Sequence, residues 1–242
     1  MPTNTQILDY ETLRIARGLE SFAKPLNIFG YNPLVGDVYI PLWENATPYT
    51  FPSSALIMTV TSNIADAGAV IKISGLDENY TPIFDTLTLD PTGTTTTSIP
   101  FFRINEVACI NANGIASGNP ANNVTISNSG VVYAKIRGGE GKSQAAIYTV
   151  PANYSFYLMR IDAFCATALQ NNREIFFRNY VQLANGVAFR VAETSFLTNM
   201  SIQRRVPFRY GEKTDIQFQL RASGGTQYMS VFGEGILVKE GN

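Results

Sequence analysis

The sequence contains no histidine, and this absence narrows the chemistry open to the protein. Histidine is the commonest general acid or base and the commonest protein ligand for metals. A serine–histidine–aspartate triad cannot be built without it. Charged residues are also scarce, at 15% of the chain against about 25% in an ordinary soluble domain. We therefore expect a protein that is not an enzyme and that holds no metal or other cofactor.

Long apolar runs are missing as well. No stretch approaches the roughly 18 consecutive apolar residues of a membrane span, and residues 1–20 lack the basic-then-apolar order of a signal peptide. The two cysteines, Cys109 and Cys165, each lie in a short apolar run, which predicts reduced, buried thiols rather than a disulfide. These features predict no membrane partner and assembly in a reducing cytoplasm.

The net charge is only −1, but it is unevenly divided along the chain. Residues 1–140 hold 7 Lys and Arg against 12 Asp and Glu, whereas residues 141–242 hold 11 against 7. A mild dipole of this kind suits a chain that docks against copies of itself or against neighbouring proteins. Nucleic acid is not an expected partner, because its recognition needs a strongly basic face.

Short runs rich in β-branched and aromatic residues fill the chain from residue 37 onward, separated by Gly, Pro, Asn and Asp turn signals. Strands at these intervals with no helix between them predict an all-β antiparallel fold. The glycine-rich segment 137–142 has the composition of a hinge. We therefore predict two antiparallel, jelly-roll-like β-sandwich domains at residues 31–137 and 143–242, preceded by an N-terminal arm at residues 1–30.

Two segments are predicted in more detail. In residues 214–222 apolar and polar side chains alternate, which predicts one buried and one exposed face of a strand. Residues 5–24 have the pattern of a helix that ends at the Lys24-Pro25 step. Its apolar stripe either covers a sheet of its own domain or packs on another subunit, and we expect the stripe to contact a partner through Leu8, Ile15, Leu19 and Phe22.

The C-terminal half contains one local basic cluster. Its members are Arg204, Arg205, Arg209 and Lys213. A phosphate contact is one interpretation of this cluster. A short basic β-hairpin that faces an acidic neighbour is preferred, because charge runs are usually solvated or paired faces.

Three other patterns are interpreted as structural. Gly141-Lys142-Ser143 resembles the end of a phosphate-binding loop, but position 136 is not glycine and no helix pattern follows, so a linker is preferred. Five acidic residues lack the dense spacing of a calcium loop and are interpreted as turn formers: Asp66, Asp77, Glu78, Asp85 and Asp90. Two aromatic groups could form a sugar-binding platform, although core packing is preferred: Trp43, Tyr49 and Phe51, and Tyr154, Phe156 and Tyr157.

Several short motifs occur in a characteristic order along the chain. They are Arg17-Gly18, the segment KPLNIFGYN at 24–32, Trp43, YTFP at 49–52, GLDENY at 75–80, FRI at 102–104 and YTVP at 148–151. Over residues 14–160 this order resembles a family of structural proteins of tailed bacteriophages, frequent among marine and cyanobacterial phages. The resemblance implies a virion building block with no catalytic residues. It favours a decoration or cement protein that stabilises the head shell, with a tail or neck protein as the next choice.

The resemblance also implies partners and a location. The chain would be a homo-oligomer, with a trimer favoured, bound to other virion proteins such as the major capsid protein in a particle assembled in the host bacterial cytoplasm. A β-sandwich module that binds carbohydrate or a receptor is the alternative. The first hypothesis expects residues 1–24 to be buried in a partner, whereas the second expects exposed aromatic rings in a groove.

Overall fold

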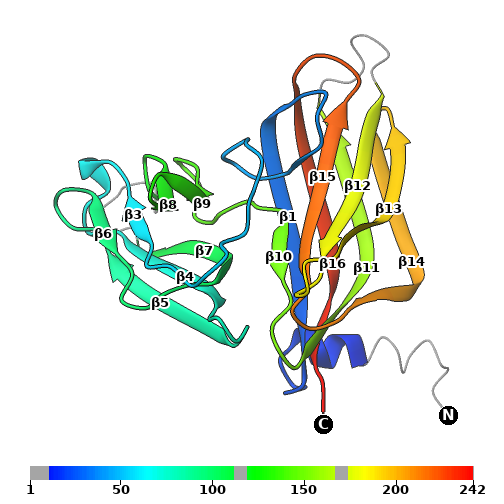
Figure 1. Cartoon of the computed structure of the whole chain (residues 1–242), viewed down its shortest axis with the longest axis horizontal. Coiled ribbons are helices and arrows are strands. Elements are labelled where there is room, and N and C mark those ends of the chain that lie inside the picture. The colour runs from blue at the N-terminus through cyan, green and yellow to red at the C-terminus, as the bar shows by residue number, and fades with distance from the viewer. Residues whose placement is uncertain (1–10, 112–118, 167–173, 242) are drawn as a thin grey trace.

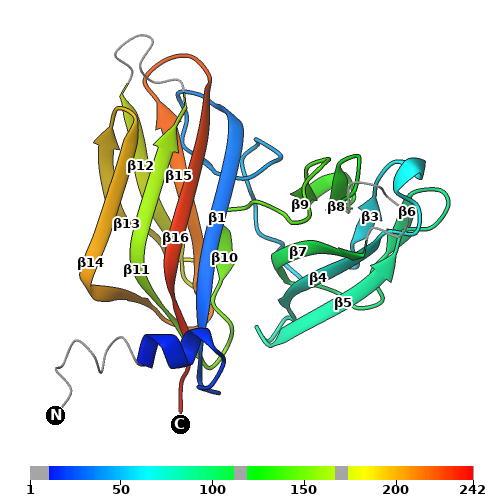
Figure 2. The ribbon, with the colours of Figure 1, turned by 180° about the vertical axis from the view of Figure 1, so that it is seen from behind.

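The computed structural model describes residues 11–111, 119–166 and 174–241 (Figure 1). The described chain is all-β, as predicted, and its antiparallel sheets form two units that lie side by side (Figures 1 and 2). Its strands are β1 (Ala23–Val35), β2 (Ile40–Pro41), β3 (Thr59–Thr61), β4 (Val70–Leu76), β5 (Pro82–Thr88), β6 (Thr94–Thr96), β7 (Arg103–Asn111), β8 (Val124–Asn128), β9 (Val131–Ile136), β10 (Ile147–Thr149), β11 (Tyr154–Cys165), β12 (Ile175–Gln182), β13 (Ala188–Phe196), β14 (Asn199–Tyr210), β15 (Asp215–Ala222) and β16 (Gln227–Lys239).

The larger unit consists of two sheets that enclose one apolar core. One sheet has the order β1-β16-β11-β14, and the other has the order β10-β15-β12-β13, with β2 also paired to β15. Strand β12 alternates buried and half-buried residues, because every second side chain points into the core. Phe156, Phe177 and Phe218 are completely buried there and come from three different strands.

Strand β15 departs from the predicted alternation. Its apolar residues face the core, but Asp215, Gln217 and Gln219 are also buried, with 4–5% of each residue exposed. Gln219 accepts a hydrogen bond from Arg178 (2.6 Å) and donates one to Gln217 (2.6 Å). The outer face of this strand is therefore covered, and its polar side chains are satisfied by partners rather than by water.

The smaller unit, called the inserted unit below, contains β3 to β9. Its sheets have the orders β6-β3-β8-β9 and β5-β4-β7. A second, separate apolar core lies between these strands and includes Met58, Ile71, Phe101 and Ile126, all completely buried. The 3-10 turn η1 (Ile64–Asp66) is the other regular element of this unit.

The inserted unit interrupts one strand of the larger unit, which is formed by β2 before the insertion and by β10 after it. Strands β2 and β10 pair with consecutive stretches of β15, so they occupy one line beside it. At the break, Leu42 donates a backbone hydrogen bond to Phe218 (3.1 Å), and Phe218 donates one to Ala146 (3.0 Å). Ala146 also donates to the carbonyl of Leu42 (2.7 Å), which joins the two ends of the insertion.

This arrangement changes the expected domain boundaries. Residues 31–42 were assigned to the first domain, but β1 pairs with β16 and β2 pairs with β15, so both belong to the larger unit. Residues 138–142 were expected to form a hinge. Instead, Cys109 donates a hydrogen bond to Gly141 (2.8 Å) and Ser143 donates one to Val107 (2.8 Å). The end of the glycine-rich segment, residues 141–143, is thus bonded along β7.

The N-terminal helix ends earlier than expected. Within the described residues it covers positions 11–16, and Gly18 follows with a positive φ of 68°. The Lys24-Pro25 step lies inside β1 rather than at a helix end. Pro25 is tolerated there because β1 is an edge strand, where a missing N–H removes no ladder hydrogen bond. No described helix is long and apolar enough to cross a membrane.

We predict that Gly30→Ala destabilises the larger unit. A Cβ at Gly30 would overlap the carbonyl oxygen of Leu42 and the side chain of Ala146, at the point where the strand is interrupted. We expect a loss of about 1–3 kcal/mol in the free energy of unfolding, measured by urea denaturation. Gly36→Ala is the matched control, because a Cβ at Gly36 meets no atom within 4 Å. Equal effects of the two substitutions would contradict the close approach.

Candidate functional site: the junction and groove between the units

A buried ion pair joins the two units. The Nε of Arg103, in β7, lies 2.9 Å from Oδ1 of Asp215, in β15, and its second guanidinium nitrogen lies 2.9 Å from Oδ2. The two side chains are 7% and 5% exposed. Two parallel charge-assisted hydrogen bonds give this contact both strength and a fixed direction.

Neighbouring residues accept hydrogen bonds from the remaining guanidinium nitrogen of Arg103 and pack against its face. Its third nitrogen donates to the carbonyl oxygens of Pro52 and Phe102, each at 2.9 Å. The guanidinium lies 3.9 Å from the ring centroid of Phe102 and 4.8 Å from that of Phe51. The hydroxyl of Thr149 donates to Asp215 (2.5 Å). A buried ion pair is stable only with such additional partners, and this one has them.

Further contacts beside the ion pair hold the units in one orientation. Asn105 donates to the carbonyl of Thr149 and accepts from its backbone N–H, both at 2.9 Å. Ala152 donates to the carbonyl of Tyr80 (2.9 Å). The junction was not found from sequence, because Arg103 and its partner are 112 positions apart. Arg103 lies in the FRI motif at 102–104, but that motif does not indicate a buried partner.

Glu44 ties together the two chain segments that connect the units. Its carboxylate accepts backbone hydrogen bonds from Gln144 (3.2 Å) and Arg137 (3.4 Å). Burial raises the pKa of Glu44 above its ordinary value, because removal from water disfavours the charged form. The backbone hydrogen bonds and the positive charge of Arg137 oppose that rise.

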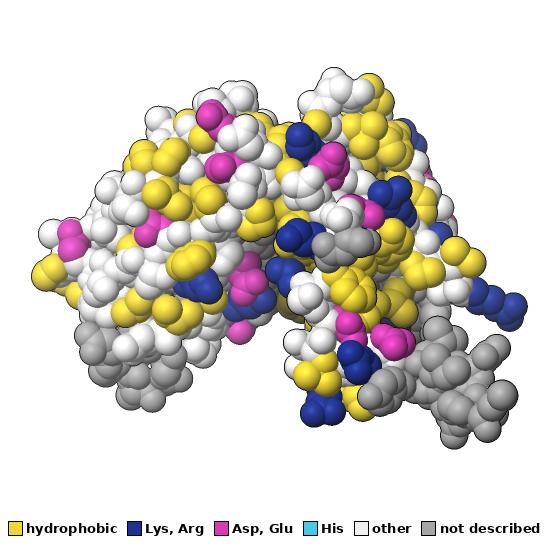
Figure 3. Space-filling view, turned by 90° about the horizontal axis from the view of Figure 1, so that it is seen from below, with side chains coloured by type: hydrophobic (Ala, Val, Ile, Leu, Met, Phe, Trp, Pro, Cys, Tyr) yellow, Lys and Arg dark blue, Asp and Glu magenta, His cyan; other side chains and the backbone are white. Residues whose placement is uncertain are grey.

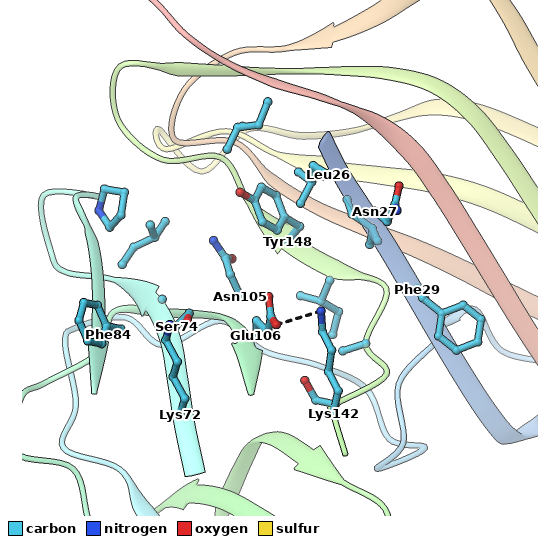
Figure 4. Close-up of a pocket in the computed structure, with 18 of the residues that line it drawn as sticks. Leu26, Asn27, Phe29, Lys72, Ser74, Phe84, Asn105, Glu106, Lys142 and Tyr148 are labelled. Atoms are coloured by element: carbon cyan, nitrogen blue, oxygen red, sulfur yellow. Dashed lines mark ion pairs between the residues drawn. The ribbon is translucent and has the colours of Figure 1, made fainter. Parts of the chain in front are cut away.

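A groove of about 750 Å³ lies between β1 of the larger unit and the β5-β4-β7 sheet of the inserted unit (Figures 3 and 4). Its two walls carry exposed aromatic rings, because Phe29 is 41% exposed and Phe84 is 65% exposed. Leu26 and Ile83 are half-buried along the same groove. The groove therefore offers apolar surface from both units.

The charged groups of the groove are unevenly paired. Lys142 forms an ion pair with Glu106 (2.9 Å), drawn as a dashed line in Figure 4. Lys72 lies over the ring of Phe84, 5.0 Å from its centroid. Within the described residues neither Lys72 nor Lys24 forms an ion pair. The groove thus presents two ammonium groups without a carboxylate partner.

The apolar stripe of the arm is largely exposed on the isolated chain. Leu19 is 52% exposed and Phe22 is 39% exposed, whereas Ile15 is half-buried. Leu8 lies outside the described residues. Leu13, which the sequence analysis did not select, is 55% exposed and joins the same segment. Leu13 and Leu19 are therefore mostly exposed, whereas Ile15 and Phe22 are partly covered by their own chain.

The predicted basic cluster is not a hairpin. Arg204, Arg205 and Arg209 all lie in β14, and the next strand, β15, belongs to the other sheet. Arg209 pairs with Glu240 (3.1 Å). Lys213 faces the inserted unit, 5.9 Å from the ring centroid of Tyr80. The four residues therefore do not form one surface.

The other candidate residues have structural roles. Asp66 is fully buried and accepts hydrogen bonds from Ser62 and from the backbone of residues 121 and 122. Asp77, Asp85 and Asp90 accept hydrogen bonds from backbone N–H groups of turns or loops. No group of three or more potential metal ligands occurs within the described parts of the chain. Trp43 is buried, and its ring N–H donates to Thr47 (2.6 Å).

Both cysteines are free thiols. Cys165 is buried, as expected, whereas Cys109 is only half-buried. Burial raises the pKa of the Cys109 thiol. This thiol is therefore not activated as a nucleophile.

Comparison with known proteins identifies no family. No protein family and no curated protein matches the sequence. A structure of the infectious bursal disease virus Gt strain aligns over 91% of this chain and 71% of its own at 9% identity, with a TM-score of 0.22. The VP2 subviral particle of that virus aligns over 90% and 81% at 6% identity, with a TM-score of 0.17. Alignments at these scores carry no conclusion about this chain, and the resemblance to phage structural proteins stays a hypothesis.

We predict that Arg103→Met destabilises the protein by about 3–5 kcal/mol, because Asp215 would remain buried without a counter-charge. The double variant Arg103→Met/Asp215→Leu should recover part of this loss, since neither charge is then buried. Arg190→Met is the control, because its ion pair with Glu193 is solvent-exposed and such pairs contribute about 0–1 kcal/mol. Chemical denaturation measures all three variants. An Arg103→Met effect no larger than that of the control would contradict the assigned role.

We predict a pH dependence that originates at Glu44. Since its pKa is raised above the ordinary 4.5, the folded protein binds this proton more tightly than the unfolded chain does. The contribution of Glu44 to stability is therefore largest below pH 4.5 and declines as pH rises to the raised pKa. Urea denaturation of the parent protein and Glu44→Gln between about pH 4 and pH 8 measures this decline. If the free energy of unfolding changes with pH in the same way in both proteins, Glu44 is not the origin of the pH dependence.

Proposed function

We propose that the protein is a non-enzymatic structural component of a virion and that its larger unit is an eight-stranded jelly roll. With β2 and β10 taken as one interrupted strand, the unit has eight strands in chain order. They lie in the sheet orders 1-8-3-6 and 2-7-4-5, which is the arrangement of two interleaved Greek keys. Jelly rolls of this type occur in viral capsid proteins, lectins and cupins.

The absence of histidine from the sequence argues against one of these classes, the metal-dependent cupins. Metal-dependent jelly-roll enzymes rely on imidazole ligands, which this chain cannot supply. A virion protein and a sugar-binding protein remain. The exposed arm favours the virion protein, and it is the observation that carries this proposal.

Burial of the arm on a partner would be strongly favourable. Leu13, Leu19 and Phe22 are exposed, and burial of each large apolar side chain contributes about 1.5–3 kcal/mol. Leu13 lies on the helix at residues 11–16, whereas Leu19 and Phe22 follow it, and a helix this short is marginal in water unless it is packed. An assembly that covers these side chains would stabilise the arm and fix the subunit to its neighbour.

The free edge at β14 does not favour pairing with another sheet. Strand β14 lies at the edge of its sheet. In β14, residues 204–207 oppose Met159 alone in β11, so the strand bulges there. Val206 at this bulge is 80% exposed, and Pro207 and two arginines accompany it. Bulges, proline and charge at an edge suppress pairing with another sheet.

The finer assignment follows from the sequence resemblance. We propose a decoration or cement protein of the head, assembled as a homo-oligomer with a trimer favoured and bound to the major capsid protein. A tail or neck position is the next choice. In either position the protein would reside in the virion.

Carbohydrate or receptor binding is the second candidate function. The exposed rings of Phe29 and Phe84 in the groove favour it, because stacking of sugars on open aromatic faces is the chemistry that such modules use. A glycan array with the purified protein tests this candidate. Binding that Phe84→Ala abolishes would support it over a purely structural role.

We predict that the triple variant Leu13→Ser/Leu19→Ser/Phe22→Ser folds but no longer assembles. The matched control changes three other exposed apolar residues, Val38→Ser/Val131→Ser/Val187→Ser. Circular dichroism and thermal melting should give the parent values for both variants, since surface substitutions change stability by about 0.5 kcal/mol or less. Sedimentation velocity and electron microscopy then measure assembly. Assembly of the arm variant at parent level, or loss of assembly in both variants, would contradict the role of the arm.

A further inference from the structure

One edge of β1 has backbone groups that point away from its sheet. The backbone N–H of Lys239 donates to the carbonyl of Phe22 (2.7 Å), and the register pairs Ala23 with Val238. In an antiparallel ladder, hydrogen-bonded and outward-pointing residues alternate. Even-numbered residues of β1 therefore bond to β16, and odd-numbered residues point their N–H and C=O groups to the opposite side.

The two ends of this outward edge already have partners. At one end Ala23 donates to Glu20, and at the other end Tyr31 donates to Gln144, both at 3.4 Å. Between them, at odd positions, lie Pro25, Asn27 and Phe29. No backbone hydrogen bond from a described residue outside the sheet reaches these three positions.

The unpaired stretch forms one wall of the groove, where Asn27 and Phe29 are visible in Figure 4. Since Pro25 has no N–H, the stretch offers its carbonyl together with both backbone groups of Asn27 and Phe29. Added strands lie about 4.7–4.9 Å from their neighbour, and the groove separates this edge from the opposite sheet. An extended segment that pairs with β1 would lie in the groove that Phe84 also lines.

The groove also specifies the composition of its occupant. Lys24 and Lys72 have no ion-pair partner among the described residues. Phe29 and Phe84 supply exposed apolar surface. The complementary segment is extended and carries aliphatic side chains next to carboxylates.

We propose that the groove binds the N-terminal residues of a second copy of this chain as an added strand on β1. Residues 1–10 lie outside the described structure, and within them Ile7 and Leu8 directly precede Asp9. Aliphatic side chains next to a carboxylate are the composition that the groove requires. This inference rests on the proposed role of the arm in assembly and assigns the surface to which the arm docks.

The choice of a second copy follows from the proposed role of the arm, because Leu13, Leu19 and Phe22 are exposed on their own chain. The helix at residues 11–16 lies below the larger unit (Figures 1 and 2).

A photo-cross-linking experiment on the full chain tests this proposal. The photoreactive residue benzoylphenylalanine replaces Phe84, one copy of the chain carries ordinary isotopes and a second copy carries nitrogen-15, and the two are mixed before irradiation. We expect cross-linked peptides that join position 84 of one isotope to residues 1–10 of the other. The same probe at Phe164, an exposed phenylalanine of β11, is the matched control and should not cross-link to this segment.

Charge reversal gives an independent readout. Lys72→Glu should lower the cross-linking yield several-fold, and Asp9→Lys in the second copy should restore it. Cross-links confined to one isotope, equal yields at positions 84 and 164, or no effect of charge reversal would overturn the proposal. Should the parent chain assemble in sedimentation without this cross-link, the groove assignment fails and the role of the arm stands. If the parent chain neither assembles nor forms this cross-link, the proposed function fails as well.

Discussion

The buried contact between Arg103 and Asp215 determines how the two units face each other. Neither charge could stay in this dry position without the other, because the cost of removing an ion from water exceeds what neutral neighbours return. The forked geometry of the guanidinium also limits rotation about the contact. The ion pair and the contacts beside it hold the two walls of the groove in place, since these walls belong to different units. An interaction without any role in binding thus determines the shape of the proposed binding surface.

The sheet edges at β14 and β1 differ in how well they can pair with a strand from another chain. At β14 a bulge, a proline and two arginines oppose pairing with a foreign sheet. At β1 the backbone groups of residues 25–29 that point away from β16 are unpaired, and the inserted unit forms the other wall of the groove beside them. In the proposed assembly this groove would accept one extended segment, so specificity would depend on access as well as on attraction.

Most strands could be predicted from sequence, because β-branched and aromatic residues alternate in them and turn residues bound them, as in β4 and β12. Strand β1 was missed because Pro25 and Gly30 disfavour a strand locally and only pairing with β16 stabilises it. The same long-range pairing transferred residues 31–42 to the larger unit. Of the stripe predicted from helical spacing, Leu19 and Phe22 are exposed but follow the helix, which ends at residue 16, and Leu8 lies outside the described residues. The groove and Arg103 could not be predicted, since they arise from contacts between segments about 100 residues apart.

The interrupted strand between Leu42 and Ala146 has a consequence for the ancestry of the protein. The chain leaves and re-enters the larger unit at two residues joined by one hydrogen bond. A segment whose ends are adjacent can change in length at little entropic cost, because loop closure depends only weakly on loop size. Replacement, enlargement or loss of the smaller unit would leave the strand order of its host intact. Related chains could therefore share one framework while carrying different inserted units, each exchanged as a single genetic cassette.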